Sequence, residues 1–324
     1  MKSPITADSG AMLNAYPDSM GGTLADIAAL LARPELRGAF TSFYILPSLF
    51  HTDLDRGFSV IDYSLNQLLA APEDLDALRE QGIDLKLDFI LNHASVLSPQ
   101  FQDIIQNGEN SPYKDFFINW NKFWEGHGTM TPSGYIQPDD ALIQKMFFRK
   151  PGLPILMVRF PDRRDVPYWN TFYQEVRYPV LEPQELMHSL GMQYGIADAV
   201  CKLVNPALAS GVIPDDIAFG ALQQWKQPVV QLLESRRRYL GQMDLNIQSP
   251  LVWEFYDDTL RRLSEYGARI VRLDAFAYAP KEPGAHNFMN VPGTWDLLEK
   301  VQELANRYGL TLLPEIHASY GEKV

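Results

Sequence analysis

The sequence predicts an α/β protein of the (β/α)8 TIM-barrel type. Short apolar runs rich in β-branched residues alternate with longer runs of helical periodicity, as expected for parallel strands joined by crossover helices. Several short runs end in polar groups, and barrel sites lie at the carboxyl ends of the strands. The open doubly wound alternative is disfavoured, because no GxGxxG motif follows the first strand.

Five runs of six to nine residues are predicted to be strands. Each is apolar, and the third, fourth and fifth end in charged or amide side chains. The predicted strands are Ala11–Tyr16, Ala39–Leu46, Ile83–Leu91, Ala268–Ala275 and Leu310–Ile316.

Helices are predicted between most of these strands, from apolar residues at helical spacing and from residues that start or stop a helix. The predicted helices are LADIAALLAR after Thr23, EDLDALREQG after Pro72, Leu251–Tyr266, and the run from Thr294 to the stop at Gly309.

About 175 residues separate His93 from the next strand at Ala268, far more than a βα loop holds. The sequence therefore predicts a large subdomain inserted after the third strand. The catalytic barrel would consist of residues 1–93 and 250–324, and the insertion of residues 94–249. On this count only the first five βα units of a barrel are present.

The insertion begins rich in proline and aromatic residues and then turns helical at about residues 173–240. The helical part is expected around Pro183–Leu208 and Ile217–Leu240. Three roles are open for it: it caps the acceptor site, mediates a homodimer contact, or decorates the barrel.

Composition indicates a folded protein that acts on small molecules. The 324 residues carry 28 basic and 40 acidic side chains, so a net charge of −12 disfavours nucleic acid and anionic membranes as partners. No run approaches the length of a membrane span, and the N-terminus lacks the apolar core of a signal peptide. A single cysteine, Cys201, suits a reducing compartment. We expect a cytoplasmic protein.

Polar residues at the ends of three strands form the candidate site. The third strand leads to Asp88, Asn92 and His93, the fourth to Arg272 and Asp274, and the fifth to Glu315 and His317.

Each of these residues also has a structural explanation. A lone Asp near an Arg, such as Asp274, is more often a salt-bridged strand-end carboxylate. Glu315 is compatible with an exposed loop acid, and His93 with a hydrogen-bonded core histidine. Strand alternation nevertheless places Arg272 and Asp274 on one face.

Two carboxylates at the ends of adjacent strands, Asp274 and Glu315, match the pair that retaining glycosidases use as nucleophile and as acid/base. The two roles need different environments. We expect Arg272 to lower the pKa of Asp274 and burial to raise the pKa of Glu315.

Four blocks resemble signature regions of the α-amylase superfamily of glycoside hydrolases. They are LPSLFHTDLDRGFSVIDY, LDFILNHAS, IVRLDAFAYAPKEPG and LLPEIH. Within that superfamily, DxGFxxID, RLDAxxYxxKExG, ExH and the opening AYPDSMGGTLADI are similar to the sucrose phosphorylase-like subgroup.

The resemblance implies a role for each matching position. Asp274 matches the nucleophile that forms a β-glucosyl enzyme, and Glu315 matches the general acid/base. The resemblance assigns substrate binding to Arg272 beside the nucleophile, His93 at the glucosyl hydroxyls, Asp55 at the far hydroxyls, Phe58 against the sugar ring, and His317 on the acceptor side.

The resemblance further implies that Asp88 and Asn92 order the site, that no metal or organic cofactor is needed, and that inorganic phosphate is the co-substrate. Phosphate needs donors. His317, Arg159, Arg163 and Arg164 are candidates, although a solvated basic surface is the more common explanation for the last two.

The sequence departs from the subgroup in two ways. About 70 residues follow Tyr168–Phe172 before the segment Gly241–Pro250, which puts the acceptor in doubt. The family's third carboxylate, after the seventh strand, has no counterpart, since nine residues follow Glu315. The chain is thus expected to be a fragment or a shortened homologue.

Sucrose phosphorylase activity is the leading functional hypothesis. The alternatives are a phosphorylase or hydrolase of another α-glucoside, such as glucosylglycerate or a sugar phosphate, and an inactive sugar-binding fragment. An open partial barrel exposes sheet edges and an inner face, which we expect to be apolar. We therefore expect this chain alone to be inactive or nearly so and to self-associate.

Overall fold

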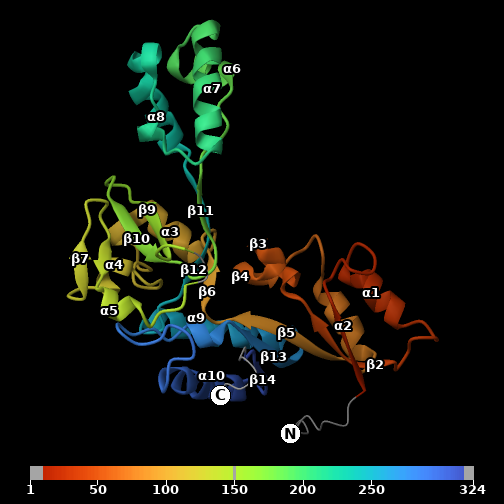
Figure 1. The fold of residues 1–324 in the computed structure, drawn as a ribbon. Helices are drawn as coiled ribbons and strands as arrows, with labels where there is room; N and C mark the ends of the chain where they lie inside the picture. The colour runs from red at the N-terminus through yellow and green to blue at the C-terminus, as the bar shows by residue number, and fades with distance from the viewer. Residues whose placement is uncertain (1–9, 149–150, 317–324) are drawn as a thin grey trace. The chain divides into compact units, whose positions relative to one another are not determined.

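The computed structural model contains a parallel sheet whose five strands are in chain order (Figure 1). The structure describes residues 10–148 and 151–316. The predicted α/β class and all five predicted strands are confirmed, with ends that differ by at most two residues. In sheet order the strands are β1 (Ala11–Ala15), β2 (Phe40–Ile45), β5 (Asp84–Ile90), β13 (Ala268–Asp274) and β14 (Thr311–Pro314).

Helices cover one face of this sheet. Because each strand lies beside its predecessor in the sheet, crossovers of one hand bring the connecting helices to the same face. Phe89 of β5 points to that face and packs against Tyr256, with ring centroids 5.3 Å apart. The helices are α1 (Leu24–Leu31), α2 (Pro72–Glu80), α9 (Pro250–Glu265) and α10 (Gly293–Arg307), and they confirm the four predicted helices.

The opposite face of the sheet is polar where we expected an apolar surface. Tyr44, Lys86, Asp88 and Arg272 contact one another on it. The expectation was wrong because these side chains pair across the strands and so bury each other's polar atoms. Within the strands of this sheet, the large apolar side chains that are exposed lie on the edge strands, at Met12 of β1 and Leu313 of β14.

The remaining elements of the first compact unit, Met1–Tyr173 with Gly241–Val324, are short. The strands are β3 (Phe50–Leu54), β4 (Ser59–Leu65), β6 (His93–Ser95), β7 (Gly128–Met130), β8 (Ile136–Pro138), β9 (Ile155–Arg159) and β10 (Asp165–Trp169). The helices are α3 (Pro99–Asn107), α4 (Trp120–Phe123), α5 (Asp140–Ile143) and the 3-10 turns Pro47–Leu49, Asp55–Gly57, Gly108–Asn110 and Phe276–Tyr278.

The second compact unit, Gln174–Leu240, has an apolar core of its own. In Figure 1 its helices α6 (Pro183–Leu190), α7 (Tyr194–Ala209) and α8 (Lys226–Ser235) lie side by side. It also contains β11 (Gln174–Arg177) and the 3-10 turns Pro214–Asp216 and Gly220–Trp225. The predicted helices at Pro183–Leu208 are confirmed. The domain boundaries at 94 and 249 stay a prediction.

One predicted helical segment is wrong at its end. Residues 238–240, expected to be helical, begin strand β12 (Arg238–Asp244). β12 pairs antiparallel with β6, with Gln242 opposite Ser95 and Asp244 opposite His93. Backbone pairing with a distant strand has overridden the local helical pattern.

Within the described part of the chain, no helix has the length and apolar character that crossing a membrane requires.

We predict that Leu233→Ala destabilises the second unit by about 2–5 kcal/mol, since Leu233 is fully buried among residues of that unit alone. Amide hydrogen exchange should become faster in α6, α7 and α8 and stay unchanged in the sheet. Ile213→Ala, at a side chain more than half exposed, is the control and should change neither. Equal acceleration in β5 and β13 would contradict an independent core.

Candidate active site

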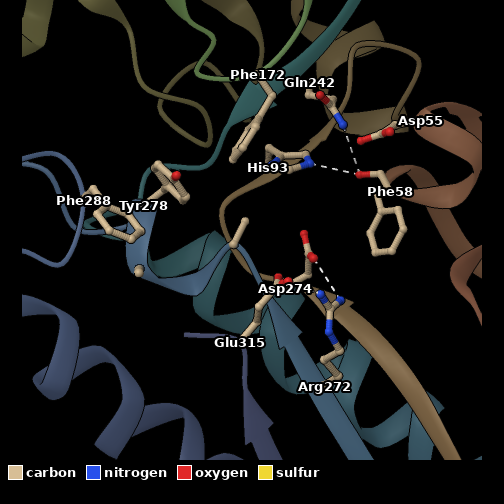
Figure 2. A pocket seen from close by; sticks show the side chains of 12 residues that line it. Asp55, Phe58, His93, Phe172, Gln242, Arg272, Asp274, Tyr278, Phe288 and Glu315 are labelled. Carbon is tan, nitrogen blue, oxygen red and sulfur yellow. Dashed lines mark hydrogen bonds and ion pairs between the residues drawn. The ribbon is translucent and has the colours of Figure 1, made fainter. Parts of the chain in front are cut away.

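A pocket of about 310 Å³ lies at the carboxyl ends of the central strands, within the first unit (Figure 2). This volume is at the lower end of the range for small-molecule sites. The lining residues come from strand ends and the loops that follow them: Asp55, Phe58, His93, Phe172, Gln242, Arg272, Asp274, Ala275, Ala277, Tyr278, Phe288 and Glu315.

Arg272 joins three carboxylates at the floor of this pocket. Its Nη1 donates to Asp88 Oδ1 at 2.6 Å and to Asp274 Oδ1 at 2.9 Å, and its Nη2 pairs with Glu315 Oε1 at 2.5 Å. The alternation predicted for β13 is therefore correct. The guanidinium offers donors in a fixed plane, so this contact fixes the relative positions of residues from three neighbouring strands.

Asp88 lies below the floor and is fully buried. Tyr44 Oη donates to its second oxygen at 2.7 Å. Burial raises the pKa of Asp88, while Arg272 and the Tyr44 hydrogen bond oppose that rise. Asp88 thus orders the arginine and does not line the pocket.

Arg272 lowers the pKa of Asp274, as expected, but it does not decide the net direction of the shift. Burial and a hydrogen bond with Glu315 raise the pKa of Asp274 to about 8, and Arg272 only partly offsets them. The sequence could not reveal this, because the shift comes from a second carboxyl group held against the first. At least one proton therefore resides on the Asp274 and Glu315 pair at neutral pH.

The two carboxyl groups are also closer than a retaining mechanism requires. They share a hydrogen bond, whereas retaining pairs stand about 5–5.5 Å apart. Glu315 must leave Asp274 before the two can act on opposite sides of one glycosidic bond. Glu315 follows the last residue of β14, and Arg272 pairs with its side chain.

His93 is buried at the upper wall, where its Nε2 lies 2.9 Å from the carbonyl oxygen of Phe58. Because the carbonyl accepts, Nε2 carries the hydrogen. Gln242 Nε2 donates to the same carbonyl at 3.3 Å. Burial lowers the pKa of His93, so the ring is neutral and its first role is to hold the backbone at Phe58.

A strained turn presents Asp55 and Phe58. Asp55, Arg56 and Gly57 have φ of +55°, +46° and +122°. A Cβ at Gly57 would lie 2.4 Å from the backbone nitrogen of Ser48, so only glycine fits there. Strain of this kind is tolerated where it places functional groups.

A second buried charge cluster lies behind the pocket, and the sequence analysis missed it. Lys281 Nζ pairs with Asp244 Oδ2 at 2.7 Å and donates to Asn92 Oδ1 at 3.0 Å and to the carbonyl of Tyr278. Asp244 also accepts from Asn92 Nδ2 at 3.1 Å and from Thr171 N and Oγ1 at 2.8 and 2.6 Å.

Three members of this cluster line the pocket or adjoin a lining residue. Asn92 precedes His93, Thr171 precedes Phe172, and Tyr278 lines the pocket itself. Asp244 stands in the segment QMDLN and Lys281 in the segment RLDAFAYAPKEPG, but only the fold shows that these two residues meet.

Aromatic rings form one side of the pocket (Figure 2). The centroids of Phe172 and Tyr278 lie 5.1 Å apart, and those of Tyr278 and Phe288 4.6 Å apart. Such a wall suits the apolar C–H faces of a sugar. None of these three residues was predicted from the sequence to belong to the site.

The structure thus brings together six of the predicted site residues as pocket lining: Asp55, Phe58, His93, Arg272, Asp274 and Glu315. Asp88 and Asn92 support them from behind. His317 lies outside the described residues.

The arginines considered as phosphate donors do not line the pocket. Arg159 forms a two-point ion pair with Asp165 at 2.7 and 2.8 Å, and Arg164 pairs with Asp162 at 2.7 Å. Arg163 lies in the turn between β9 and β10. Carboxylates of the same hairpin pair with Arg159 and Arg164, and the role of the three arginines as phosphate donors stays a prediction.

Over residues 10–148 and 151–316, no group of three or more His, Cys, Asp or Glu is arranged to hold a metal ion.

Two curated relatives match nearly the whole chain. A sucrose 6(F)-phosphate phosphorylase of Ilumatobacter coccineus is 47% identical over 313 residues, which are 97% of this chain and 50% of that protein. A sucrose phosphorylase of Streptococcus mutans is 26% identical over 310 residues, 95% of this chain and 48% of that protein. The chain spans about half the length of the curated relatives it matches. No family model matches it.

Solved structures agree on the fold. The crystal structure of sucrose 6F-phosphate phosphorylase from Thermoanaerobacter thermosaccharolyticum matches with a TM-score of 0.69 and 26% identity, over 97% of this chain and 49% of that one. The trehalulose synthase MutB of Pseudomonas mesoacidophila matches with a TM-score of 0.59 at 15% identity, over 94% of this chain and 44% of that one, which supports the fold alone.

We predict that Lys281→Met lowers the free energy of unfolding by about 3–5 kcal/mol, because it leaves Asp244 charged and buried without its partner. Adding Asp244→Asn should recover part of that loss. Lys122→Met breaks an exposed pair with Asp115 and should cost less than about 1 kcal/mol. Chemical denaturation measures all three, and equal losses for the two lysine variants would contradict the assignment.

We predict a pH dependence of stability from Asp274. Its pKa is raised in the folded chain, so the folded state binds the proton more tightly than the unfolded state. The resulting stability is complete below about pH 4 and is lost as pH rises through about 8. Relative to Asp274→Asn, the native chain should therefore lose stability across this window. A difference in melting temperature between the two proteins that stays constant from pH 4 to pH 8 would rule out the raised pKa of Asp274.

Proposed function

The chain belongs to the sucrose phosphorylase-like group of the α-amylase superfamily, and from this we propose that it carries the glucosyl-binding site of a retaining α-glucosyl transferase. The observation that carries the proposal is the group of Asp274, Glu315 and Arg272 at the floor of the pocket. The in-order strands of the parallel sheet support the finer proposal that the sheet is the first five βα units of a (β/α)8 barrel.

In the proposed first step Asp274 attacks the anomeric carbon of an α-glucoside. Glu315, protonated at the start, gives its proton to the leaving oxygen, and a β-glucosyl ester of Asp274 forms. The pair already holds a proton at neutral pH, which supports this starting state. Arg272 then has to hold Asp274 ionised once Glu315 carries the proton.

In the proposed second step an oxygen of inorganic phosphate attacks the anomeric carbon of the glucosyl ester and passes its proton to Glu315, while the bond from that carbon to the Asp274 oxygen breaks and frees the Asp274 carboxylate. The product is α-glucose 1-phosphate. The sugar-binding roles proposed for Asp55, Phe58 and His93 are supported by their places in the pocket wall. His317 stays a candidate on the acceptor side. The rotation of Glu315 away from Asp274 is the movement that substrate binding has to induce.

We propose sucrose carrying a 6F-phosphate as the first donor to test, because the relative at 47% identity bears that name. Sucrose and glucosylglycerol, from the names of relatives at 25–26% identity, are the next donors.

A metal-free site is likewise a proposal. It is supported by Lys281, whose ammonium occupies the space between Asn92 and Asp244 and uses their oxygens. A cytoplasmic location and a homodimer stay predictions from the sequence.

Sugar binding without turnover is the second candidate function. The close approach of Asp274 to Glu315 favours it, since carboxyls in that arrangement cannot flank a glycosidic bond. Calorimetry with glucose would reveal binding in either case, so only covalent chemistry separates the two functions.

We predict that Glu315→Gln accumulates a glucosyl ester on Asp274 when given α-glucosyl fluoride. Fluoride leaves without a proton from Glu315, whereas breakdown of the ester needs the missing base. Intact-mass and peptide spectrometry should find one added glucosyl group, located on Asp274.

Two controls make that test decisive. Asp274→Asn in the same background should give no adduct, and Glu282→Gln, at an exposed glutamate on the loop after β13, should behave as the native chain. Binding of glucose with no adduct in any variant would overturn the transferase proposal and leave the binding function. Measuring the glucose 1-phosphate released from each donor then shows which leaving group the site accepts.

A further inference from the structure

Lys86 lies on the polar face of the sheet, two residues before Asp88 on β5. It is 8% exposed, and its Nζ lies 4.0 Å from the ring centroid of Tyr44. Among the described residues no carboxylate lies within ion-pairing distance of that ammonium, and no hydrogen bond to it is present. A lysine whose side chain is largely buried, and whose ammonium has no direct anionic partner, loses solvation without gaining an ion pair.

Lys86 is connected to the floor of the pocket through Tyr44. The Tyr44 ring faces the ammonium, and the Tyr44 hydroxyl donates to Asp88 at 2.7 Å. Asp88 in turn accepts from Arg272, which also holds Asp274 and Glu315. The Tyr44 side chain therefore contacts the Lys86 ammonium with its ring and the Asp88 carboxylate with its hydroxyl.

The charges of this face balance only when Lys86 is counted. If Glu315 carries a proton, as the first step requires, Asp88 and Asp274 supply two negative charges and Arg272 one positive charge. Lys86 supplies the second positive charge and makes the sum zero. In a region of low dielectric constant, the missing charge would favour uptake of a second proton by the carboxylates.

The other titratable groups facing Lys86 do not replace it. Asp84, two residues earlier on β5, pairs with Arg269 at 2.6 Å and adds no net charge. Burial lowers the pKa of Lys86, while Asp88 and Glu315 raise it and Arg272 lowers it. The titratable groups that contact Lys86 or shift its pKa are Tyr44 on β2, Asp88 on β5, Arg272 on β13 and Glu315 after β14.

We propose that Lys86 is a positioning residue, whose charge acts through Tyr44 and Asp88 to keep Asp274 ionised as the nucleophile while Glu315 holds the proton. The inference rests on the proposed function for the roles of Asp274 and Glu315. The effect of the Lys86 charge on the titration of Asp274 and Glu315 can be measured without turnover of any substrate.

The test is a carboxyl carbon NMR titration of the 324-residue chain labelled at Asp and Glu. Asp88→Asn, Asp274→Asn and Glu315→Gln assign the three signals. In Lys86→Met the apparent midpoint for the Asp274 and Glu315 pair should rise by about one pH unit. In Lys86→Arg, which keeps the charge, it should stay at the native value.

Two further variants keep the test falsifiable. Lys122→Met removes a positive charge at an exposed site of the same unit and should leave the midpoint unchanged. Lys86→Gln replaces Lys86→Met if the latter does not fold. A native midpoint in the Lys86 neutral variants, or an equal shift in Lys122→Met, would overturn the role of Lys86. An upward shift together with absence of the glucosyl adduct would retain that role and reject the proposed chemistry.

Discussion

The pocket depends on one guanidinium that binds three carboxylates from neighbouring strands. Arg272 contacts Asp88 on β5, Asp274 at the end of β13 and Glu315 beyond β14. Parallel strands bring their carboxyl ends to one edge, but they do not prevent like charges there from repelling one another. The arginine makes their approach tolerable, and Tyr44 completes the hydrogen bonds of the most buried carboxylate. Every chemical role proposed for the site begins from this arrangement.

A second charge cluster holds the opposite wall by different means. Lys281 and Asp244 are almost fully buried, and their hydrogen bonds reach three loops far apart in the sequence. The ammonium uses all of its three donors on Asp244, Asn92 and Tyr278, so the cluster leaves no free charge. The Arg272 cluster contains the reacting groups, and its carboxyl groups outnumber its one guanidinium. In the Lys281 cluster, one positive charge pairs with one negative charge. This difference separates a site that must change protonation from one that only positions side chains.

The sequence was sufficient for features that repeat or that stand at strand ends. The runs before His93 and Asp274 have the apolar alternation of strands, so the sheet and the four lining residues at strand ends were predictable. Asp55 and Phe58 came only from the family resemblance. Lys281 and Asp244 were missed because a buried ion pair is recognisable only once both partners are known, and these two lie far apart in the sequence. Lys86 was missed because its burial and its contact with the Tyr44 ring appear only in the fold. The ion pairs of Arg159 and Arg164 with their hairpin neighbours Asp165 and Asp162 became visible only in the structure. The net rise in the pKa of Asp274 was not predicted, because burial and Glu315 outweigh Arg272.

Arg272 holds all three carboxylates at once. An atomic-resolution crystal structure of the chain near neutral pH is the decisive measurement, because carboxyl bond lengths at that resolution locate the protons. We expect Arg272 Nη1 within hydrogen-bond distance of both Asp88 and Asp274, Nη2 in contact with Glu315, and one proton shared by Asp274 and Glu315. An Arg272 side chain turned away from Asp274, or two fully ionised carboxylates in contact with each other, would contradict this arrangement.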